Sequence, residues 1–287
     1  MMINMNRPPR CHRFDPRVDL RKIRHVVFDM DGTLYSGKTL FDYTKQTLDT
    51  LESLGIGYTY LTNNSSLSAK DYLHKIINLG LNGTSENIFT SSLATIAYLK
   101  KYHPTLKKVY VLGTQSLRDE FVDYGYSLAT EDNAEEPDLV IAAFDTTLTF
   151  DRLCKAAWWV KQGKPYIATH PDKICPTDLP TVLVDCGAVC ACIENATGRA
   201  PDVVLGKPDR VMIDSIIEKH GLQTGEIAMV GDRLYTDMEM ARQAGIVGVL
   251  VLSGEATLED FEKSGLATEL VVDNIAALAE LLKNALN

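Results

Sequence analysis

The sequence contains no feature typical of a membrane protein or of a broad nucleic-acid-binding surface. Its longest apolar run, at about residues 246–252, is too short to cross a bilayer. Positive charge is in deficit, since the net charge is −9 at pH 7, and this argues against a nucleic-acid partner. A small anionic substrate is still compatible, because a site can be locally positive within an acidic protein.

Cysteine is scarce, and its spacing matches no common metal or disulfide pattern. The chain has six cysteines and no Cys-x-x-Cys pair, and at 287 residues it can bury enough core to be stable without disulfides. Three of the six cluster at Cys186, Cys190 and Cys192. A zinc site among these three is one interpretation, and we expect the other, which is buried reduced thiols.

The first 22 residues contain several arginines but no apolar segment of the kind that a secretory signal requires. We interpret residues 1–22 as an N-terminal extension without an assigned role. We therefore expect no secretory signal and a cytoplasmic location.

The most informative stretch is a short strand that ends on two carboxylates. The apolar run at residues 23–28 predicts a buried strand, which Asp29 and Asp31 terminate together with Gly32. Residues two apart along a strand tend to point the same way, so both carboxylates can converge on one ion. Placing two carboxylates so near each other costs free energy unless a cation or a proton relieves their repulsion. Taken alone, the stretch also fits two turn-capping aspartates.

Strand and helix patterns alternate in both terminal parts of the chain, which predicts a doubly wound parallel sheet of the α/β class. In these parts we expect strands at residues 56–61, 227–230 and 247–252, and helices at 41–54, 68–79, 208–220, 237–244 and 276–286.

A second α/β block lies between these parts. In it we expect strands at residues 109–112, 139–142 and 166–169, and helices at 115–124, 150–160 and 188–195. The simplest architecture is therefore a core formed by residues 23–87 and 201–287, interrupted by an inserted α/β domain at 88–200.

Short motifs place polar side chains at the predicted strand ends and helix starts of the core. They are Asp29-Met-Asp31, Thr62-Asn63-Asn64, Gly206-Lys207-Pro208, and Gly231-Asp232 with Asp237. The carboxylates offer the hard oxygen ligands that suit Mg²⁺. The threonine hydroxyl and the amides after it can donate to an anion, and a lysine at the start of a helix adds positive charge. The set fits phosphoryl transfer.

These four motifs, in this order, resemble those of the haloacid dehalogenase (HAD) superfamily of phosphatases. An inserted domain after the second motif is similar to subfamily IIA, the NagD-like phosphatases, which include phosphoglycolate, pyridoxal phosphate, sugar phosphate and 4-nitrophenyl phosphatases. Residues 167–172 and 196–201 also look like stretches of that subfamily. There are three departures from the subfamily pattern. The subfamily commonly has Asn where His170 stands and a Pro-Gly-rich turn near residues 185–187, and Tyr235 replaces a usually smaller or acidic residue.

The resemblance implies catalytic and metal-binding roles for the acidic residues. Asp29 would attack phosphorus and form an aspartyl-phosphate, and Asp31 would protonate the leaving oxygen and then activate water. Asp29 and Asp232 would hold Mg²⁺ through their carboxylates, and Asp31 would do so through its backbone carbonyl. Asp237 would orient the ligands or Lys207. Asp237 is alternatively the N-cap of the helix that follows it.

The same resemblance assigns a set of phosphate- and substrate-binding residues: Thr62, Asn63, Asn64, Lys207 and His170. Lys207 would pair with the charge on the transferring phosphoryl oxygens. Taken alone, Lys207 fits a solvated helix residue and Thr62 a turn hydroxyl. For His170, a place in the substrate pocket and a purely structural contact are equally open.

The resemblance thus implies a hydrolase acting on phosphoric monoesters, namely a Mg²⁺-dependent phosphatase of small phosphorylated metabolites. A phosphotransferase or mutase on the same scaffold is one alternative, and a non-catalytic binding protein is another. The expected partner is a small-molecule phosphate ester, and we also expect a homodimer formed through the cap. The metabolite itself is not identified by the sequence.

Overall fold

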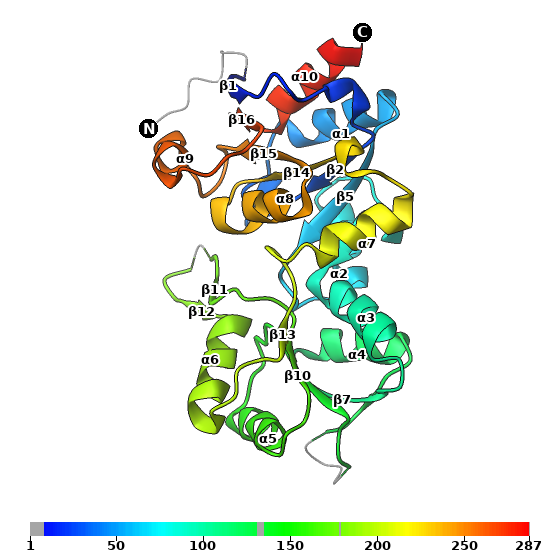
Figure 1. Ribbon diagram of the computed structural model, residues 1–287, viewed down its shortest axis with the longest axis vertical. Coiled ribbons are helices and arrows are strands. Elements are labelled where there is room, and N and C mark those ends of the chain that lie inside the picture. Colours follow the sequence, from blue (N-terminus) through cyan, green and yellow to red (C-terminus); the bar gives the residue numbers. More distant parts are fainter. Residues whose placement is uncertain (1–8, 131–134, 178, 287) are drawn as a thin grey trace. The chain divides into compact units, whose positions relative to one another are not determined.

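The computed structural model describes residues 9–130, 135–177 and 179–286 (Figure 1). The chain forms two compact units. Unit 1 comprises Met1–Leu61, Ile77–Asn82 and Ile216–Asn287, and unit 2 comprises Thr62–Ile76 and Gly83–Ser215. The boundaries expected at residues 88 and 200 from the inserted domain stay a prediction. Within the described ranges, no helix is long and apolar enough to span a membrane.

Unit 1 is built on a mostly parallel sheet with the strand order β1-β16-β15-β14-β2-β5. Its strands are β1 (Cys11–Phe14), β2 (His25–Phe28), β5 (Gly57–Thr62), β14 (Ile227–Gly231), β15 (Val247–Val251) and β16 (Leu270–Val272). Only β1, which belongs to the predicted N-terminal extension, pairs antiparallel. Every residue of β2 and β14 is buried, as expected for strands with both faces covered.

Helices cover both faces of this sheet, which confirms the predicted α/β fold class. Figure 1 shows α1 and α10 on one side of the sheet and α8 on the other. The helical segments of unit 1 are η1 (Leu20–Lys22), α1 (Thr44–Ser53), η3 (Thr224–Glu226), the π-helical turn η4 (Leu234–Met238), α8 (Glu239–Ala244), α9 (Leu258–Ser264) and α10 (Ile275–Leu286). A small hairpin, β3 (Tyr35–Ser36) and β4 (Thr39–Leu40), follows the first motif.

Unit 2 contains an all-parallel sheet with the order β13-β10-β9-β7-β8. The strands of this sheet are β7 (Lys108–Leu112), β8 (Ser127–Leu128), β9 (Leu139–Ala142), β10 (Tyr166–Ala168) and β13 (Val203–Val204). Outside this sheet, unit 2 contains β6 (Ile88–Thr90) and the antiparallel pair β11 (Ile174–Cys175) and β12 (Leu183–Val184). Its helices are η2 (Ser85–Asn87), α3 (Ser91–Tyr102), α4 (Gln115–Asp123), α5 (Phe150–Lys161) and α6 (Cys186–Thr197). The division between the units falls within α2 (Ala69–Asn78) and α7 (Val211–His220).

The two faces of the unit 2 sheet illustrate how alternation in the sequence builds two cores. Val109 and Val111 of β7 pack with α3 and α4. Tyr110 and Leu112 of the same strand pack with α5 and α6 on the opposite face. Successive side chains of a strand point to opposite faces, so one apolar run serves both layers.

Two of the clustered cysteines belong to one of these cores. Cys186 and Cys190 are buried on α6 with their sulfur atoms 4.0 Å apart, whereas Cys192 is exposed. All three are free thiols.

Several elements were not predicted from the sequence: α3, α9, β1 and β16.

The buried histidine of β2 makes the stability of unit 1 sensitive to pH. The Nε2 atom of His25 lies 2.8 Å from the Thr59 hydroxyl. Burial, together with the neighbouring His220 and Lys219 charges, lowers the pKa of His25 to about 4. As the pH falls, His25 therefore takes up a proton near pH 6.5 in the unfolded chain but only near pH 4 in the folded chain.

We expect this difference to lower the free energy of unfolding by about 2 kcal/mol between pH 7 and pH 5. Urea unfolding at both pH values measures the loss. His25→Gln keeps a partner for Thr59 but does not titrate, so the same experiment on that variant should show a loss smaller by this amount. Equal losses in both proteins would contradict the assignment to His25.

Candidate functional site

The first group of site residues lies where the topology of the unit 1 sheet reverses. From β2 the chain proceeds to β5 on one side, whereas β14, β15 and β16 lie on the other. Asp29 directly follows β2, Asp232 directly follows β14, and these strands are neighbours. The Asp29 amide donates a 2.8 Å hydrogen bond to the Val230 carbonyl. Ligands of open α/β sheets bind at the carboxyl ends of the strands at such a point.

Asp237 joins this group through the π-helical turn that precedes α8. The residue is fully buried, and its Oδ2 accepts a 3.1 Å hydrogen bond from the Arg233 amide. A Cβ added at Gly231 would lie 2.3 Å from the Asp237 Cγ, so glycine at this position leaves room for the carboxylate. The N-cap of α8 is Met238, so Asp237 does not cap that helix. Such π-turns are frequent at functional sites.

Asp29, Asp232 and Asp237 together form a three-carboxylate cluster. One carboxylate oxygen of each lies within 4.8 Å of the others. Asp232 is held in place because its Oδ2 accepts a 2.7 Å hydrogen bond from the Glu255 amide, and a Cβ at Gly254 would come within 2.0 Å of the same oxygen. Carboxylates this close repel one another unless a cation lies among them. The cluster can therefore hold a metal ion.

A fixed positive charge accompanies the cluster. The Nε of Arg233 lies 3.0 Å from the Glu255 carboxylate. Burial would lower the pKa of Arg233, but the charges of Asp29, Asp232 and Glu255 outweigh it and raise that pKa above its usual range. The sequence analysis overlooked Arg233, although it directly follows Asp232 in the fourth motif.

The Asp31 side chain does not lie beside that of Asp29. β2 ends at Phe28, so the alternation of a strand no longer applies to the two aspartates. Gly32, with a φ of 86°, reverses the chain and donates to the Tyr35 carbonyl at 2.7 Å. Asp31 is exposed, its Oδ1 accepts from the Gly37 amide at 3.3 Å, and within the described ranges it is not part of the carboxylate cluster. A metal contact through its backbone carbonyl stays a prediction.

A second group of predicted residues comes together in unit 2, around the amide of Asn63. Its Nδ2 donates to the Lys207 carbonyl at 3.0 Å, and its Oδ1 accepts from the Lys207 amide at 2.7 Å. Lys207 is only 3% exposed, so it is not a solvated helix residue. Nor does it begin a helix, because α7 starts at Val211, whose amide bonds to the Asp209 side chain at 2.7 Å.

Thr62 and Asn64 are engaged in the turn after β5. The Thr62 hydroxyl accepts a 3.2 Å hydrogen bond from the Asn64 amide. The Oδ1 of Asn64 accepts from the amide and the hydroxyl of Ser66, at 2.9 and 2.7 Å. Both residues thus shape the loop that carries Asn63. Phosphate binding by Thr62, Asn63 and Asn64 stays a prediction.

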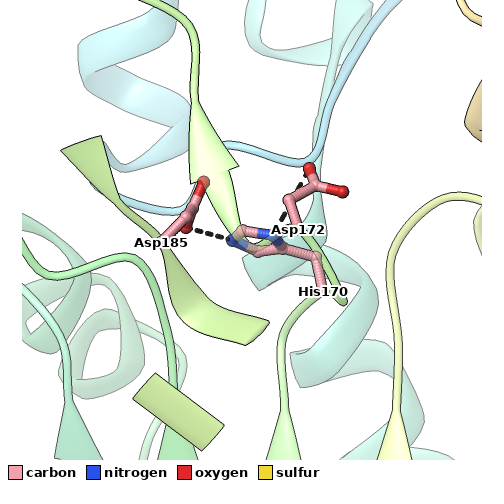
Figure 2. Close-up of side chains that lie close together, drawn as sticks. All are labelled: His170, Asp172 and Asp185. Atoms are coloured by element: carbon pink, nitrogen blue, oxygen red, sulfur yellow. Dashed lines mark ion pairs between the residues drawn. The ribbon is translucent and has the colours of Figure 1, made fainter. Parts of the chain in front are cut away.

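His170 lies beside this second group. It is fully buried, and its two ring nitrogens face the carboxylates of Asp172 and Asp185 (Figure 2). The sequence analysis placed His170 in the substrate pocket or in a structural contact, and contact with a substrate stays a prediction. It assigned no role to either aspartate, because their contacts with His170 are tertiary.

Comparison with known proteins places the chain in a family. Residues 26–127 match the family model of the haloacid dehalogenase-like hydrolases, and residues 204–278 match a second HAD-hydrolase-like model. An acid sugar phosphatase of Staphylococcus aureus is 31% identical over 265 residues, which are 92% of this chain and 100% of that protein. The chain belongs to the haloacid dehalogenase-like hydrolases. This confirms the resemblance found in the sequence.

Solved structures refine the position of this HAD-like hydrolase. A 4-nitrophenylphosphatase from Thermotoga maritima is 41% identical with a TM-score of 0.85, covering 91% of this chain and 98% of that one. NagD from Escherichia coli is 30% identical with a TM-score of 0.79, covering 88% and 97%. A p-nitrophenyl phosphatase from Archaeoglobus fulgidus is 27% identical with a TM-score of 0.83, covering 90% and 99%. The protein is thus a NagD-like hydrolase of the phosphoric monoester class.

Proposed function

We propose that this HAD-like hydrolase is a Mg²⁺-dependent phosphatase that hydrolyses small phosphorylated metabolites, such as a sugar phosphate or phosphoglycolate. The proposal depends most on one observation, the cluster of Asp29, Asp232 and Asp237 at the switch point of the unit 1 sheet. The acid sugar phosphatase and 4-nitrophenylphosphatase relatives support the substrate class, with 4-nitrophenyl phosphate as an artificial substrate.

The donor atoms of the cluster fit Mg²⁺. All three side chains offer carboxylate oxygens, which are the ligands of a hard divalent cation, and no sulfur or imidazole ligand belongs to this group. Asp29 and Asp232 would hold the ion together with the backbone carbonyl of Asp31, and Asp237 would orient these ligands. Bound there, Mg²⁺ would screen the repulsion between the Asp29 carboxylate and an approaching phosphate ester.

Two successive displacements then account for hydrolysis. An Asp29 oxygen forms a bond to phosphorus, the bond from phosphorus to the alcohol oxygen breaks, and Asp31 gives its proton to that oxygen. The product is an aspartyl-phosphate on Asp29. Asp31, now a carboxylate, takes a proton from water, whose oxygen attacks phosphorus and displaces the Asp29 carboxylate. Phosphate leaves, and both aspartates return to their starting states.

The remaining predicted residues would bind the phosphoryl group. The positive charge of Lys207 would pair with its oxygens, and Thr62, Asn63 and Asn64 would donate hydrogen bonds to them. The paired hydrogen bonds between Asn63 and the Lys207 backbone support this role, because they fix the lysine at a defined place. A homodimer through the cap and a cytoplasmic location stay predictions.

Phosphate release from a panel of esters tests the proposal. The panel contains 4-nitrophenyl phosphate, sugar phosphates, phosphoglycolate, pyridoxal phosphate and nucleoside monophosphates, ranked by kcat/KM. We expect release in Mg²⁺ buffer, complete loss with EDTA, and recovery when Mg²⁺ is added in excess. Full activity without metal would contradict the metal site. Dominant transfer to an added acceptor alcohol, over free phosphate, would favour a phosphotransferase or mutase instead.

A further inference from the structure

The side chains around His170 form a buried, charged arrangement that the proposed reaction does not use directly. His170 follows β10, and Asp185 is the N-cap of α6, where its Oδ1 accepts a 2.6 Å hydrogen bond from the Cys186 amide. Asp185 is 2% exposed and His170 is 0% exposed. Charged groups this deep require compensation within the protein, since water does not reach them.

His170 lies between two carboxylates. Its Nδ1 lies 3.5 Å from the Asp172 Oδ2, and its Nε2 lies 3.5 Å from the Asp185 Oδ1, on the opposite side of the ring (Figure 2). The Ser65 hydroxyl lies 3.2 Å from Nε2 as well.

Asp172 links this arrangement to the second group of site residues. The Asp172 oxygen that faces His170 also accepts a 3.1 Å hydrogen bond from the Asn63 Nδ2. Burial would raise the pKa of Asp172, but the contact with His170, the Asn63 hydrogen bond and the Lys207 charge lower it below its usual value. Asp172 is therefore a carboxylate that attracts the amino side of the Asn63 amide.

The orientation of that amide decides how Lys207 is held. Its nitrogen must face the Lys207 carbonyl and its oxygen the Lys207 amide, and both hydrogen bonds are lost if the group turns over. Space here is tight, since a Cβ at Gly206 would lie 2.8 Å from the Asn63 oxygen and 2.7 Å from the His170 Cβ. A shift of His170 or Asp172 is thus transmitted to the backbone of Lys207.

We propose that His170 is a positioning residue for phosphoryl transfer: clamped between Asp185 and Asp172, it fixes the Asn63 amide and through it the backbone of Lys207. The proposal rests on the role of Lys207 in the proposed function. The proposal predicts that His170 affects kcat without touching the substrate. The reason is that the lysine charge stabilises the transition state, where negative charge develops on the phosphoryl oxygens, more than it stabilises the bound substrate.

A double-mutant cycle in the full-length protein tests the proposal. The variants are His170→Asn, Asp185→Asn, which keeps a good N-cap residue, and the double variant. With 4-nitrophenyl phosphate and Mg²⁺ we expect each single variant to lower kcat by about tenfold with little change in KM. Both changes act on the same link, which runs from Asp185 through His170 to Asp172, so the double variant should lose about as much kcat as the larger single loss and far less than the product of the two.

Further variants separate positioning from folding. His74→Asn, an exposed histidine of α2, should keep the wild-type kcat. Thermal unfolding of every variant shows which are folded at the assay temperature. If His170→Asn does not fold, Asp172→Asn breaks the same link while leaving the His170–Asp185 pair, and the same loss of kcat is expected.

A folded His170→Asn variant with wild-type kcat, or independent losses that multiply, would overturn the positioning role. So would an Asp172→Asn variant with wild-type kcat. Failure of the proposed function has a different signature, because then the wild-type protein itself releases no phosphate from any ester.

Discussion

Asp29→Asn is expected to lower the release of phosphate from 4-nitrophenyl phosphate by on the order of 10⁴-fold or more. The amide keeps the size of the side chain but offers no nucleophilic oxygen, and it removes one negative charge from the three-carboxylate cluster. Initial rates in saturating Mg²⁺ measure the effect. The matched control is Asp49→Asn, an exposed carboxylate of α1, which should retain the wild-type rate.

This result separates a nucleophile from a metal ligand that merely assists. If Asp29 only held the metal, higher Mg²⁺ concentrations would restore part of the rate in the variant. No recovery is expected across the accessible Mg²⁺ range. A rate for Asp29→Asn within a few-fold of that of Asp49→Asn would show that the chemistry takes place elsewhere.

Asp31→Asn is expected to divide the reaction into its two steps. 4-Nitrophenolate is a good leaving group and departs without a proton, so the first displacement on Asp29 still proceeds. Water is then no longer activated, because the base is missing. We expect a rapid burst of about one equivalent of 4-nitrophenol for each enzyme molecule, followed by turnover that is about 10²- to 10⁴-fold slower than in the wild type.

An alkyl phosphate ester, such as a sugar phosphate, provides the comparison for Asp31→Asn. Its alkoxide needs a proton to leave, so the variant should show neither a burst nor turnover with it. The exposed place of Asp31, outside the carboxylate cluster, agrees with a group that exchanges its proton with substrate and water. Equal loss on both substrates without a burst would contradict its role as acid and base.

The fold could be predicted where burial imposes a clear pattern on the sequence. β14 and β9 are buried along their whole length and appear in the sequence as continuous apolar segments. β2 is equally buried and departs from this pattern only at His25. Short or mixed segments could not be recognised in this way. β16 has only three residues, and α3 carries buried Ser92 and Thr95 in place of a clear apolar stripe.

The local shape of the candidate site was also beyond the sequence. The expected helix at residues 237–244 begins two residues later, after a π-helical turn, and this turn brings Asp237 to Asp29 and Asp232. Motif order indicated Asp29, Asp232 and Asp237, which lie together, but it could not show that the Asp31 side chain lies outside this group. The strand ends at Phe28, and the chain then reverses at Gly32, whose amide donates to the Tyr35 carbonyl.

Two of the three departures from the subfamily pattern illustrate the same limit. His170 and the turn at residues 185–187 are separated in the sequence by the β11–β12 pair, and each taken alone is only an unusual residue. In the structure the Nε2 of His170 lies 3.5 Å from the Asp185 Oδ1, so these two departures form one contact. A single sequence cannot reveal such a pairing, because the contact arises from folding and not from spacing.

The most direct measurement is the identification of the phosphorylated residue. The Asp31→Asn variant is mixed with 4-nitrophenyl phosphate, quenched in acid during the burst, and digested for mass spectrometry. We expect one added phosphoryl group on the peptide that contains Asp29, on no other peptide, and none in a variant that also carries Asp29→Asn. Phosphate on a different residue, or free phosphate released without any phosphorylated peptide, would contradict catalysis through Asp29.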